Sequence, residues 1–393
     1  MNICIITSSF PSRRDDTAQA PFVIDFIREL RKRKHQVFVF TQDRKGEKEE
    51  FLEGVHVERF PWIKSGKPLV QLNPFNPMDV FRILNLLYHG RVSLPRFIKE
   101  KRIEICLALW ILPGGYFANH AFRRTKVPYS VWSLGSDIYR YGKYRFLHPL
   151  MRRIIHEAKG VFADGFDLSR RIEERFGRKC FFLATTRSLS HFSPPSKETS
   201  PRASLIPPDP ASSTSKPYRF LFVGRIEKVK GIDLLLEAMA CLKEEGGNVH
   251  LTVVGRGGME AWAKRFIKER DLGEHVSWME GVSEETLASL YESSDCVVIP
   301  SRSESIPLVF SEALRFDKDL IVSDVGDMGT LGRQFGVARV VPSEDRMALK
   351  EVMKKRAELG DQGTEHRDEV RREELKRLFD MKTSVERFLA DYM

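Results

Sequence analysis

Short apolar runs alternate with amphipathic segments along most of the chain. Residues 3–7 (ICIIT) and 36–41 (QVFVFT) have the composition of buried strands, and residues 21–34 between them carry apolar side chains at helical spacing. Further strand-like runs follow at 104–109, 128–134 and 160–165. Because strands that alternate with helices form parallel sheets covered on both faces, this half predicts a doubly wound α/β domain.

The alternation stops and then restarts. Residues 193–217 are rich in Ser, Pro and Thr, which predicts an exposed linker. From residue 218 a second series begins, with strands expected at 218–224, 249–255, 275–280, 296–300 and 320–324. We therefore expect two Rossmann-like domains, residues 1–192 and 218–364, that face each other across a ligand-binding cleft at the carboxyl ends of their strands.

Composition narrows the class of protein. The chain has 393 residues, of which 42% are hydrophobic and 30% charged, as expected for a soluble globular protein of two domains. MNICIITSSF resembles a first strand rather than a signal peptide, and no apolar run approaches the ~18 residues of a membrane span. Five scattered cysteines without CxxC spacing favour neither disulfides nor zinc and predict a reducing, cytoplasmic compartment.

Charge is spread unevenly along the sequence. Residues 1–215 carry 36 Lys and Arg against 21 Asp and Glu, a formal charge of +15, whereas residues 216–393 carry 28 against 33, a formal charge of −5. The basic half suggests an anionic partner such as a membrane surface, although an uneven solvated surface is equally compatible. No interleaved basic and aromatic pattern of a nucleic-acid binder is present, so we expect no nucleic-acid partner.

Residues 79–102 indicate which anionic partner is favoured. This stretch places an apolar segment ahead of five cations: Val80, Phe81, Ile83, Leu84, Leu86 and Leu87, then Arg91, Arg96, Lys99, Lys101 and Arg102. A helix of this kind can lie in a bilayer interface with its cations on anionic headgroups. The alternative is a helix that packs on the core and has a solvated basic end.

The stretch 300–314, PSRSESIPLVFSEAL, joins a predicted strand to a predicted helix and carries Glu304 and Glu312. We expect Ser305 to cap a helix that begins near Pro307, whose free amide groups then form an anion site. Helical side chains lean toward the amino terminus, so both carboxylates can flank one ligand and accept hydrogen bonds from sugar or ribose hydroxyls. Two solvent-facing glutamates are the simpler alternative.

Two glycine-containing loops follow earlier strands of the same half. GRIEKVKG (224–231) supplies Gly224 for close backbone approach and two cations, Arg225 and Lys230. VVGRGG (253–258) places Gly255 at a strand end. Each loop alone is weak evidence for a phosphate site, because basic residues and glycines are common in strand-to-helix turns.

Taken together, these motifs resemble the nucleotide-sugar domain of glycosyltransferase family 4, which has the GT-B fold. The resemblance is close from residue 218 to about 350 and looser in the first half. It rests on FVGRIEKVKGIDLLLEAM, VVGRGG, VSWMEGVSEETLASLYESSDCVVIPS and ESIPLVFSEAL, and in the first half on SFPS, FVIDFIRELRKRKHQV, WILPGG, LGSDIY and FADGFDLSRRI. Residues 365–393 resemble the family's last helix, which crosses back to the first domain.

The resemblance implies roles for individual residues. Arg225 and Lys230 would hold the diphosphate, Glu312 the ribose and Glu304 the donor sugar, so that Arg225, Lys230 and Glu304 form the catalytic set. The rest of the donor site would comprise Gly224, Gly255, Gly281, Val282, Ser305, Ile306, Pro307 and Leu308. No metal or other cofactor is expected, because the cations and the helix end stabilise the departing diphosphate. The one DxD sequence, at residues 317–319, falls at the amino end of a predicted strand.

The first half departs from the family pattern. Ala18, Gln19, Ala20 and Pro21 stand where a Gly-Gly pair is common, Leu134 replaces a frequent histidine, and TTRSLSHF (185–192) replaces a proline–asparagine–glycine stretch. Asp137 and Trp110 are our candidates for acceptor contacts. For Asp137, a helix cap is an equally good interpretation.

These features predict a retaining, metal-independent glycosyltransferase. It would move a sugar from a nucleotide-diphosphate donor to a saccharide or lipid-linked acceptor in cell-envelope or exopolysaccharide synthesis, in the cytoplasm or peripherally on the inner face of the cell membrane. Two alternatives use the same architecture: a sugar-nucleotide epimerase, which needs an acid–base set near the sugar, and a non-catalytic sugar-nucleotide binding module.

Overall fold

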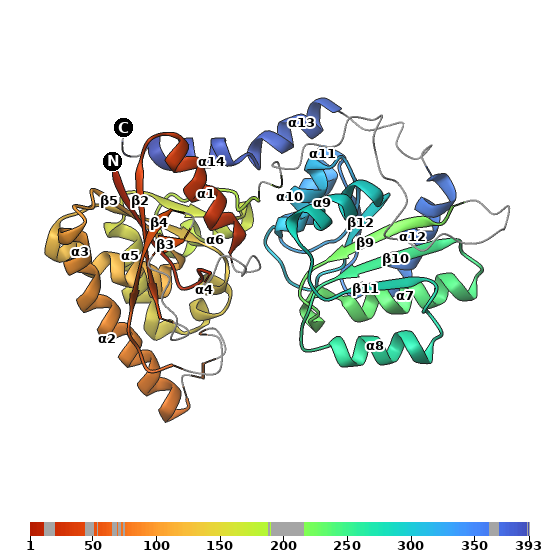
Figure 1. The fold of residues 1–393 in the computed structure, drawn as a ribbon, viewed down its shortest axis with the longest axis horizontal. Coiled ribbons are helices and arrows are strands. Elements are labelled where there is room, and N and C mark those ends of the chain that lie inside the picture. The colour runs from red at the N-terminus through yellow and green to blue at the C-terminus, as the bar shows by residue number, and fades with distance from the viewer. Residues whose placement is uncertain are drawn as a thin grey trace. The chain divides into compact units, whose positions relative to one another are not determined.

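The computed structural model describes residues 1–11, 20–43, 51–52, 54–64, 69, 72–73, 75–187, 189, 216–360, 369–390 and 392. The chain divides into two compact units, Met1–Thr186 with Leu378–Met393 and Arg187–Arg377, and each is described by itself (Figure 1). The linker predicted at residues 193–217 lies outside the described residues except for its last two.

The first unit is built on a sheet that has eight strands within the described residues, in the order β3-β4-β2-β1-β5-β6-β7-β8. β3 pairs antiparallel with β4, and the other neighbours run parallel. The strands are β1 (Asn2–Ile6), β2 (Gln36–Gln42), β3 (Phe51–Leu52), β4 (Val55–Phe60), β5 (Ile105–Leu109), β6 (Tyr129–Ser133), β7 (Val161–Ala163) and β8 (Phe181–Phe182).

Amphipathic helices cover this sheet. They are α1 (Pro21–Lys32), α2 (Pro77–Glu100), α3 (Tyr116–Thr125), the short α4 (Ser136–Tyr139), α5 (His148–Glu157), α6 (Phe166–Phe176) and, from the carboxyl end of the chain, α14 (Met381–Ala390). Phe388 of α14 packs on Phe26 of α1, with ring centroids 5.8 Å apart, and Arg387 donates to the carbonyl oxygen of Phe182 at 2.6 Å. The final helix is therefore an integral part of the first unit.

The second unit has a parallel sheet whose described strands follow the order β11-β10-β9-β12-β13-β14. The strands are β9 (Tyr218–Val223), β10 (Val249–Val254), β11 (Val276–Met279), β12 (Cys296–Ile299), β13 (Asp319–Ser323) and β14 (Arg339–Val341). β9 and β12 are direct neighbours, although two strands separate them in sequence. The chain winds outward from β9 in one direction and from β12 in the other, so the strand order reverses between them.

Helices cover both faces of this second sheet (Figure 1). α7 (Ile232–Glu244) and α8 (Glu260–Glu269) lie on one face, where α12 (Arg346–Leu359) packs against α7. α9 (Glu284–Ser293), α10 (Leu308–Arg315) and α11 (Met328–Phe335) lie on the other, and α13 (Glu369–Leu378) follows α12. The predicted pair of doubly wound α/β domains is confirmed. Among the described residues, no helix is both long enough and apolar enough to cross a bilayer.

Three loops at the carboxyl ends of β9, β10 and β12 pack backbone against backbone. Gly231 has φ +74°, and a Cβ atom there would lie 1.9 Å from the carbonyl oxygen of Pro300. A Cβ atom on Gly255 would likewise lie 1.9 Å from the carbonyl oxygen of Gly224. No side chain fits at either glycine, so these positions bring the loops together.

We predict that Gly231→Ala destabilises the second unit by at least about 2 kcal/mol more than Gly246→Ala does. Both glycines have a left-handed backbone, with φ +74° and +73°, but a Cβ on Gly246 meets no atom within 4 Å. The second substitution therefore measures the cost of the backbone conformation alone. Urea unfolding of both variants checks the difference, and equal losses in free energy of unfolding would contradict the packing role of Gly231.

Candidate functional site

The reversal of strand order between β9 and β12 places two loops side by side at one edge of the second sheet. In open parallel sheets such a point is where ligands bind, because the two loops diverge and leave room between them. Here the first loop is Gly224–Gly231 and the second is Ser301–Pro307. These loops carry the cations and the first glutamate singled out from the sequence.

Arg302 fixes the second loop to the first. Its backbone amide donates to the carbonyl oxygen of Val229 at 2.8 Å, and its guanidinium donates to the carbonyl oxygen of Lys228 at 2.5 Å. The same guanidinium binds both carboxylate oxygens of Asp233, at 2.6 and 2.9 Å. A bidentate pair of this kind fixes orientation as well as distance. The hydrogen bonds of Arg302 to the Lys228 carbonyl oxygen and to Asp233 thus hold the loop that carries Lys230.

Lys230 and Glu304 form an ion pair in which the Nζ of Lys230 donates to the Oε2 of Glu304. Their side chains are 18% and 19% exposed, so the pair lies at the surface of the loop cluster. Arg225 is exposed and makes no side-chain hydrogen bond or ion pair with the described residues. Of the two cations predicted to bind phosphate, Lys230 is thus ion-paired, and Arg225 has no side-chain partner among the described residues.

The helix after the second loop begins differently from our prediction. α10 starts at Leu308, its N-cap is Pro307, and no side chain caps it. The predicted cap by Ser305 is therefore wrong: its Oγ is buried and has no hydrogen-bond partner among the described residues. Because Pro307 is the N-cap, Ser305 lies two residues before the capping position. The first helical amides consequently have no side-chain acceptor, as an anion site requires.

Glu312 lies on α10 and points into the protein. Its side chain is 3% exposed, and Oε2 accepts a hydrogen bond of 2.6 Å from the hydroxyl of Tyr291 on α9. Burial raises the pKa of Glu312, and the charge of Arg187, whose Nη1 lies 4.0 Å from Oε1, opposes that rise. Glu304 and Glu312 therefore occupy different environments: one carboxylate pairs with a lysine, and the other is held by a tyrosine.

The remaining predicted donor residues lie at the same edge of the sheet. Gly281 and Val282 follow β11, and Ser283 caps the next helix by accepting from the amide of Thr286. Ile306 is buried, whereas Leu308 is half-buried at the start of α10. Gly255 has a packing role against the first loop, which explains its presence without any ligand.

The aspartates of the DxD sequence are ion-paired elsewhere. Asp317 accepts from Arg372 at 3.1 Å and from Lys376 at 2.7 Å, both on α13. Asp319, at the start of β13, pairs with the buried Arg356. Both carboxylates thus stabilise helix packing at the amino ends of the strands.

The first unit has its own reversal of strand order, between β1 and β5. Asp137 lies close to this point but is fully buried. It accepts from the amide of Ile111 at 2.8 Å and from the hydroxyl of Ser133 at 2.8 Å, and burial raises its pKa. Its carboxylate thus ties the loop after β5 to β6, while the N-cap position of α4 is occupied by Gly135. An acceptor contact of Asp137 stays a prediction.

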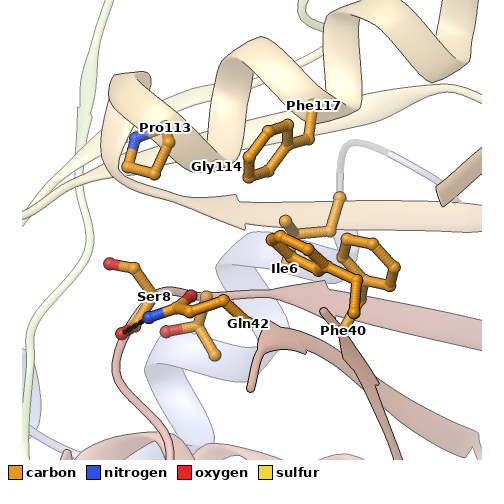
Figure 2. A pocket seen from close by; sticks show the side chains of 9 residues that line it. Ile6, Ser8, Phe40, Gln42, Pro113, Gly114 and Phe117 are labelled. Carbon is orange, nitrogen blue, oxygen red and sulfur yellow. Dashed lines mark hydrogen bonds between the residues drawn. The ribbon is translucent and has the colours of Figure 1, made fainter. Parts of the chain in front are cut away.

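Trp110 begins that loop and is half-buried, with φ +63°. A left-handed backbone is rare for a bulky residue and is found where the surroundings enforce it. Next to the loop is a small hollow lined by Ile6, Phe40, Phe60, Phe117 and Pro113, with Ser8 and Gln42 at its edge (Figure 2). Gln42 donates to the carbonyl oxygen of Ser8 at 2.7 Å, so the polar groups here are partly satisfied.

Sequence reasoning missed four residues of the second unit: Arg187, Asp233, Tyr291 and Arg302. Arg302 stands inside PSRSES, where a cation next to a predicted phosphate loop was a usable signal. Tyr291 lies on the buried face of α9 with Leu287 and Ala288, so its pattern was that of a core residue. Arg187 is distant in sequence from everything that it contacts, and no local pattern identifies it.

Comparisons with known proteins agree with this architecture. The family model described as "Glycosyl transferases group 1" matches residues 208–374, and the model described as "Glycosyl transferase 4-like domain" matches residues 17–179. An alpha-D-kanosaminyltransferase of Streptomyces kanamyceticus is 30% identical over 122 residues, which are 31% of this chain and 32% of that protein. The chain aligns with 27% to 47% of the length of such curated relatives.

Solved structures cover the whole chain. A sucrose-phosphate synthase from Thermosynechococcus elongatus matches with a TM-score of 0.74 at 17% identity, covering 100% of this chain and 98% of that one. HepE of Anabaena, solved in complex with UDP-glucose, matches with a TM-score of 0.69 at 15% identity and 99% coverage of both chains. At these identities the likeness concerns the fold. With the two family models spanning most of its length, the chain belongs to the group 1 glycosyltransferases, glycosyltransferase family 4, and has their GT-B fold.

Proposed function

We propose that the protein is a retaining, metal-independent glycosyltransferase. It moves a sugar from a nucleotide-diphosphate donor to a saccharide or lipid-linked acceptor in cell-envelope or exopolysaccharide synthesis. The observation that carries this proposal is the cluster of Arg225, Lys230 and the uncapped start of α10 at the β9/β12 reversal. Retention of configuration is what membership in the family implies.

The chemistry of sugar transfer fits this cluster. When the bond from the sugar to the diphosphate breaks, negative charge grows on the departing phosphate oxygens. Cations and helix amides fixed in advance around those oxygens stabilise that charge most in the transition state. Arg225 and Lys230 supply two positive charges, and the start of α10 adds the positive end of a helix dipole.

The Lys230–Glu304 pair suggests how the donor is bound. In a nucleotide sugar, a phosphate lies next to the sugar. In the protein, Lys230, which can bind phosphate, lies next to Glu304, which can accept hydrogen bonds from sugar hydroxyls. Donor binding then exchanges the direct ion pair for a Lys230–phosphate contact and a Glu304–hydroxyl contact.

Independence from metal is supported by the charges that the chain itself supplies. Arg225 and Lys230 occupy the place where a divalent cation would otherwise neutralise the diphosphate. The carboxylates of Asp317 and Asp319 are committed to Arg372, Lys376 and Arg356 at the amino ends of the strands. The nucleotide-sugar donor itself is supported by the fold neighbour HepE, which was solved with UDP-glucose.

We predict that Arg225→Ala and Lys230→Ala each lower transfer activity by at least ~100-fold, the order expected when one donor to a developing oxyanion is lost. Lys228→Ala is the matched control, because Lys228 is an exposed lysine of the same loop that lies outside the proposed clamp. Activity is measured as sugar transfer, or slow donor hydrolysis, on a panel of UDP-, GDP- and ADP-sugars. If both variants keep activity within a few-fold of wild type, the clamp is wrong.

We further propose that α2 docks peripherally on the anionic inner face of the cell membrane. Four large apolar residues of its first half are exposed: Met78 at 56%, Phe81 at 53%, Leu84 at 59% and Tyr88 at 56%. Their spacing of three or four residues puts them on one side of the helix, here called the α2 stripe. Phe75, 81% exposed, lies just before the helix.

Cations continue the α2 stripe toward the carboxyl end of the helix. Arg91 lies over the ring of Tyr88, with its guanidinium carbon 5.6 Å from the ring centroid, and Arg96 and Lys99 follow on the same side, both exposed. Leu86 and Leu94 face the core instead. One side of α2 therefore offers apolar groups for the acyl region and cations for anionic headgroups, which suits a lipid-linked acceptor.

We predict that the protein co-sediments with anionic liposomes and that salt weakens this binding, because each cation near the surface contributes about 1 kcal/mol that salt screens. Phe81→Ser combined with Leu84→Ser should reduce the bound fraction at least about tenfold, since two apolar side chains lose their burial. Val370→Ser is the control, because Val370 is an 80% exposed apolar residue of α13. If equal amounts of protein co-sediment with neutral and anionic vesicles, or none with either, the membrane proposal is wrong.

A further inference from the structure

Arg187 is held beside Glu312 by a neighbour on α9. It is the first residue of the second unit and its side chain is only 13% exposed. One terminal nitrogen, Nη2, donates to Oε1 of Glu284 at 2.7 Å. This contact orients the guanidinium, whose other terminal nitrogen, Nη1, lies near Glu312.

Neither group of the Arg187–Glu312 pair is satisfied by the other. Nη1 of Arg187 lies 4.0 Å from Oε1 of Glu312, which is beyond hydrogen-bond range. Nε of Arg187 is buried and has no hydrogen-bond partner among the described residues. Glu312 has its other oxygen, Oε2, occupied by Tyr291. Nη1 of Arg187 and Oε1 of Glu312 thus face each other across a gap of 4.0 Å, which a third polar atom would close.

The chemistry of the two sides limits what that third atom is. It must donate to a carboxylate and accept from a guanidinium at the same time. Phosphate oxygens are repelled by Glu312, and an amine is repelled by Arg187. A ligand hydroxyl does both, as does the water molecule that it would displace, and one oxygen can lie about 2.8 Å from each of two atoms that are 4.0 Å apart.

We propose that Arg187 is a second ribose-binding residue of the donor site, donating to the same hydroxyl whose proton Glu312 accepts. This inference rests on the proposed function, in which a nucleoside diphosphate is the leaving group of the donor. It places one ribose hydroxyl between α10 and the segment at Arg187. Arg187 falls in the stretch 185–192, which departs from the family pattern.

The test is a cycle that removes each partner of the contact in turn. Affinities of UDP, GDP and ADP, and of their 2′-deoxy and 3′-deoxy counterparts, are measured by calorimetry on wild type and on Arg187→Met. Loss of the bridging hydroxyl should weaken wild-type binding by about 10- to 100-fold, as expected for hydrogen bonds to charged groups. In Arg187→Met the same deletion should cost at least threefold less, because part of the contact is already gone.

Arg219→Met is the matched control, because Arg219 is also ion-paired, to Asp295, but lies at the amino end of β9. Its penalty for hydroxyl deletion should equal that of wild type. Arg187→Lys, which keeps the charge but not the planar fork, is measured in the same way should Arg187→Met fail to fold. If nucleoside diphosphates bind, and removal of the ribose hydroxyl weakens binding equally in wild type and in Arg187→Met, the role of Arg187 is wrong while the proposed function stands. If neither UDP, GDP nor ADP binds wild type, both the role of Arg187 and the proposed function are wrong.

Discussion

The arrangement of the loops in the second unit depends on the contact between the backbone at Gly231 and the carbonyl oxygen of Pro300. That contact locks the loop after β9 to the loop after β12, and Arg302 adds charged hydrogen bonds across the same junction. Without it, neither Lys230 nor Glu304 would have a fixed position, because both are carried by these loops. The reversal of strand order brings the two loops to the same edge of the sheet, and Gly231 allows their backbones to touch.

Electrostatics then divides the site into two regions. At the loop junction, cations outnumber carboxylates, and within the described part of the chain Lys230 pairs only with the partly exposed Glu304. In the second turn of α10, Glu312 is buried beside Tyr291 and Arg187, and burial raises its pKa. A nucleotide sugar has matching regions, with an anionic diphosphate in the middle and hydroxyls on the sugar and the ribose. In the proposed complex, the diphosphate lies at the loop junction and the ribose lies beside Glu312.

Much of the fold was predictable because strand and helix periodicities are local. The strand expected at 249–255 is β10, Val249–Val254, and the helix expected at 307–316 is α10, Leu308–Arg315. The short strand β14, Arg339–Val341, was missed because three residues carry too little pattern. The loops that hold Lys230 and Glu304 were found because their glycine and charge spacing is also local.

The errors at the site have physical reasons that sequence alone does not show. Ser305 has a capping residue type, but Pro307 takes the N-cap position and leaves the serine hydroxyl buried. The hydrogen bonds of Asp137 to the amide of Ile111 and the hydroxyl of Ser133 were likewise not visible in the sequence, because both partners reach it through the fold. Arg187 and Tyr291 meet Glu312 only through the tertiary fold, so only coordinates reveal them.

The central claim is that the loops at the β9/β12 reversal bind the diphosphate of a nucleotide sugar. The most direct measurement is a thermal-shift screen of the full chain against UDP-, GDP- and ADP-sugars, without added metal and with a metal chelator. A ligand that binds the folded state raises the unfolding temperature by mass action, so one base should give a clear, saturable increase. No increase with any donor, or an increase that the chelator abolishes, would contradict a metal-independent donor site at these loops.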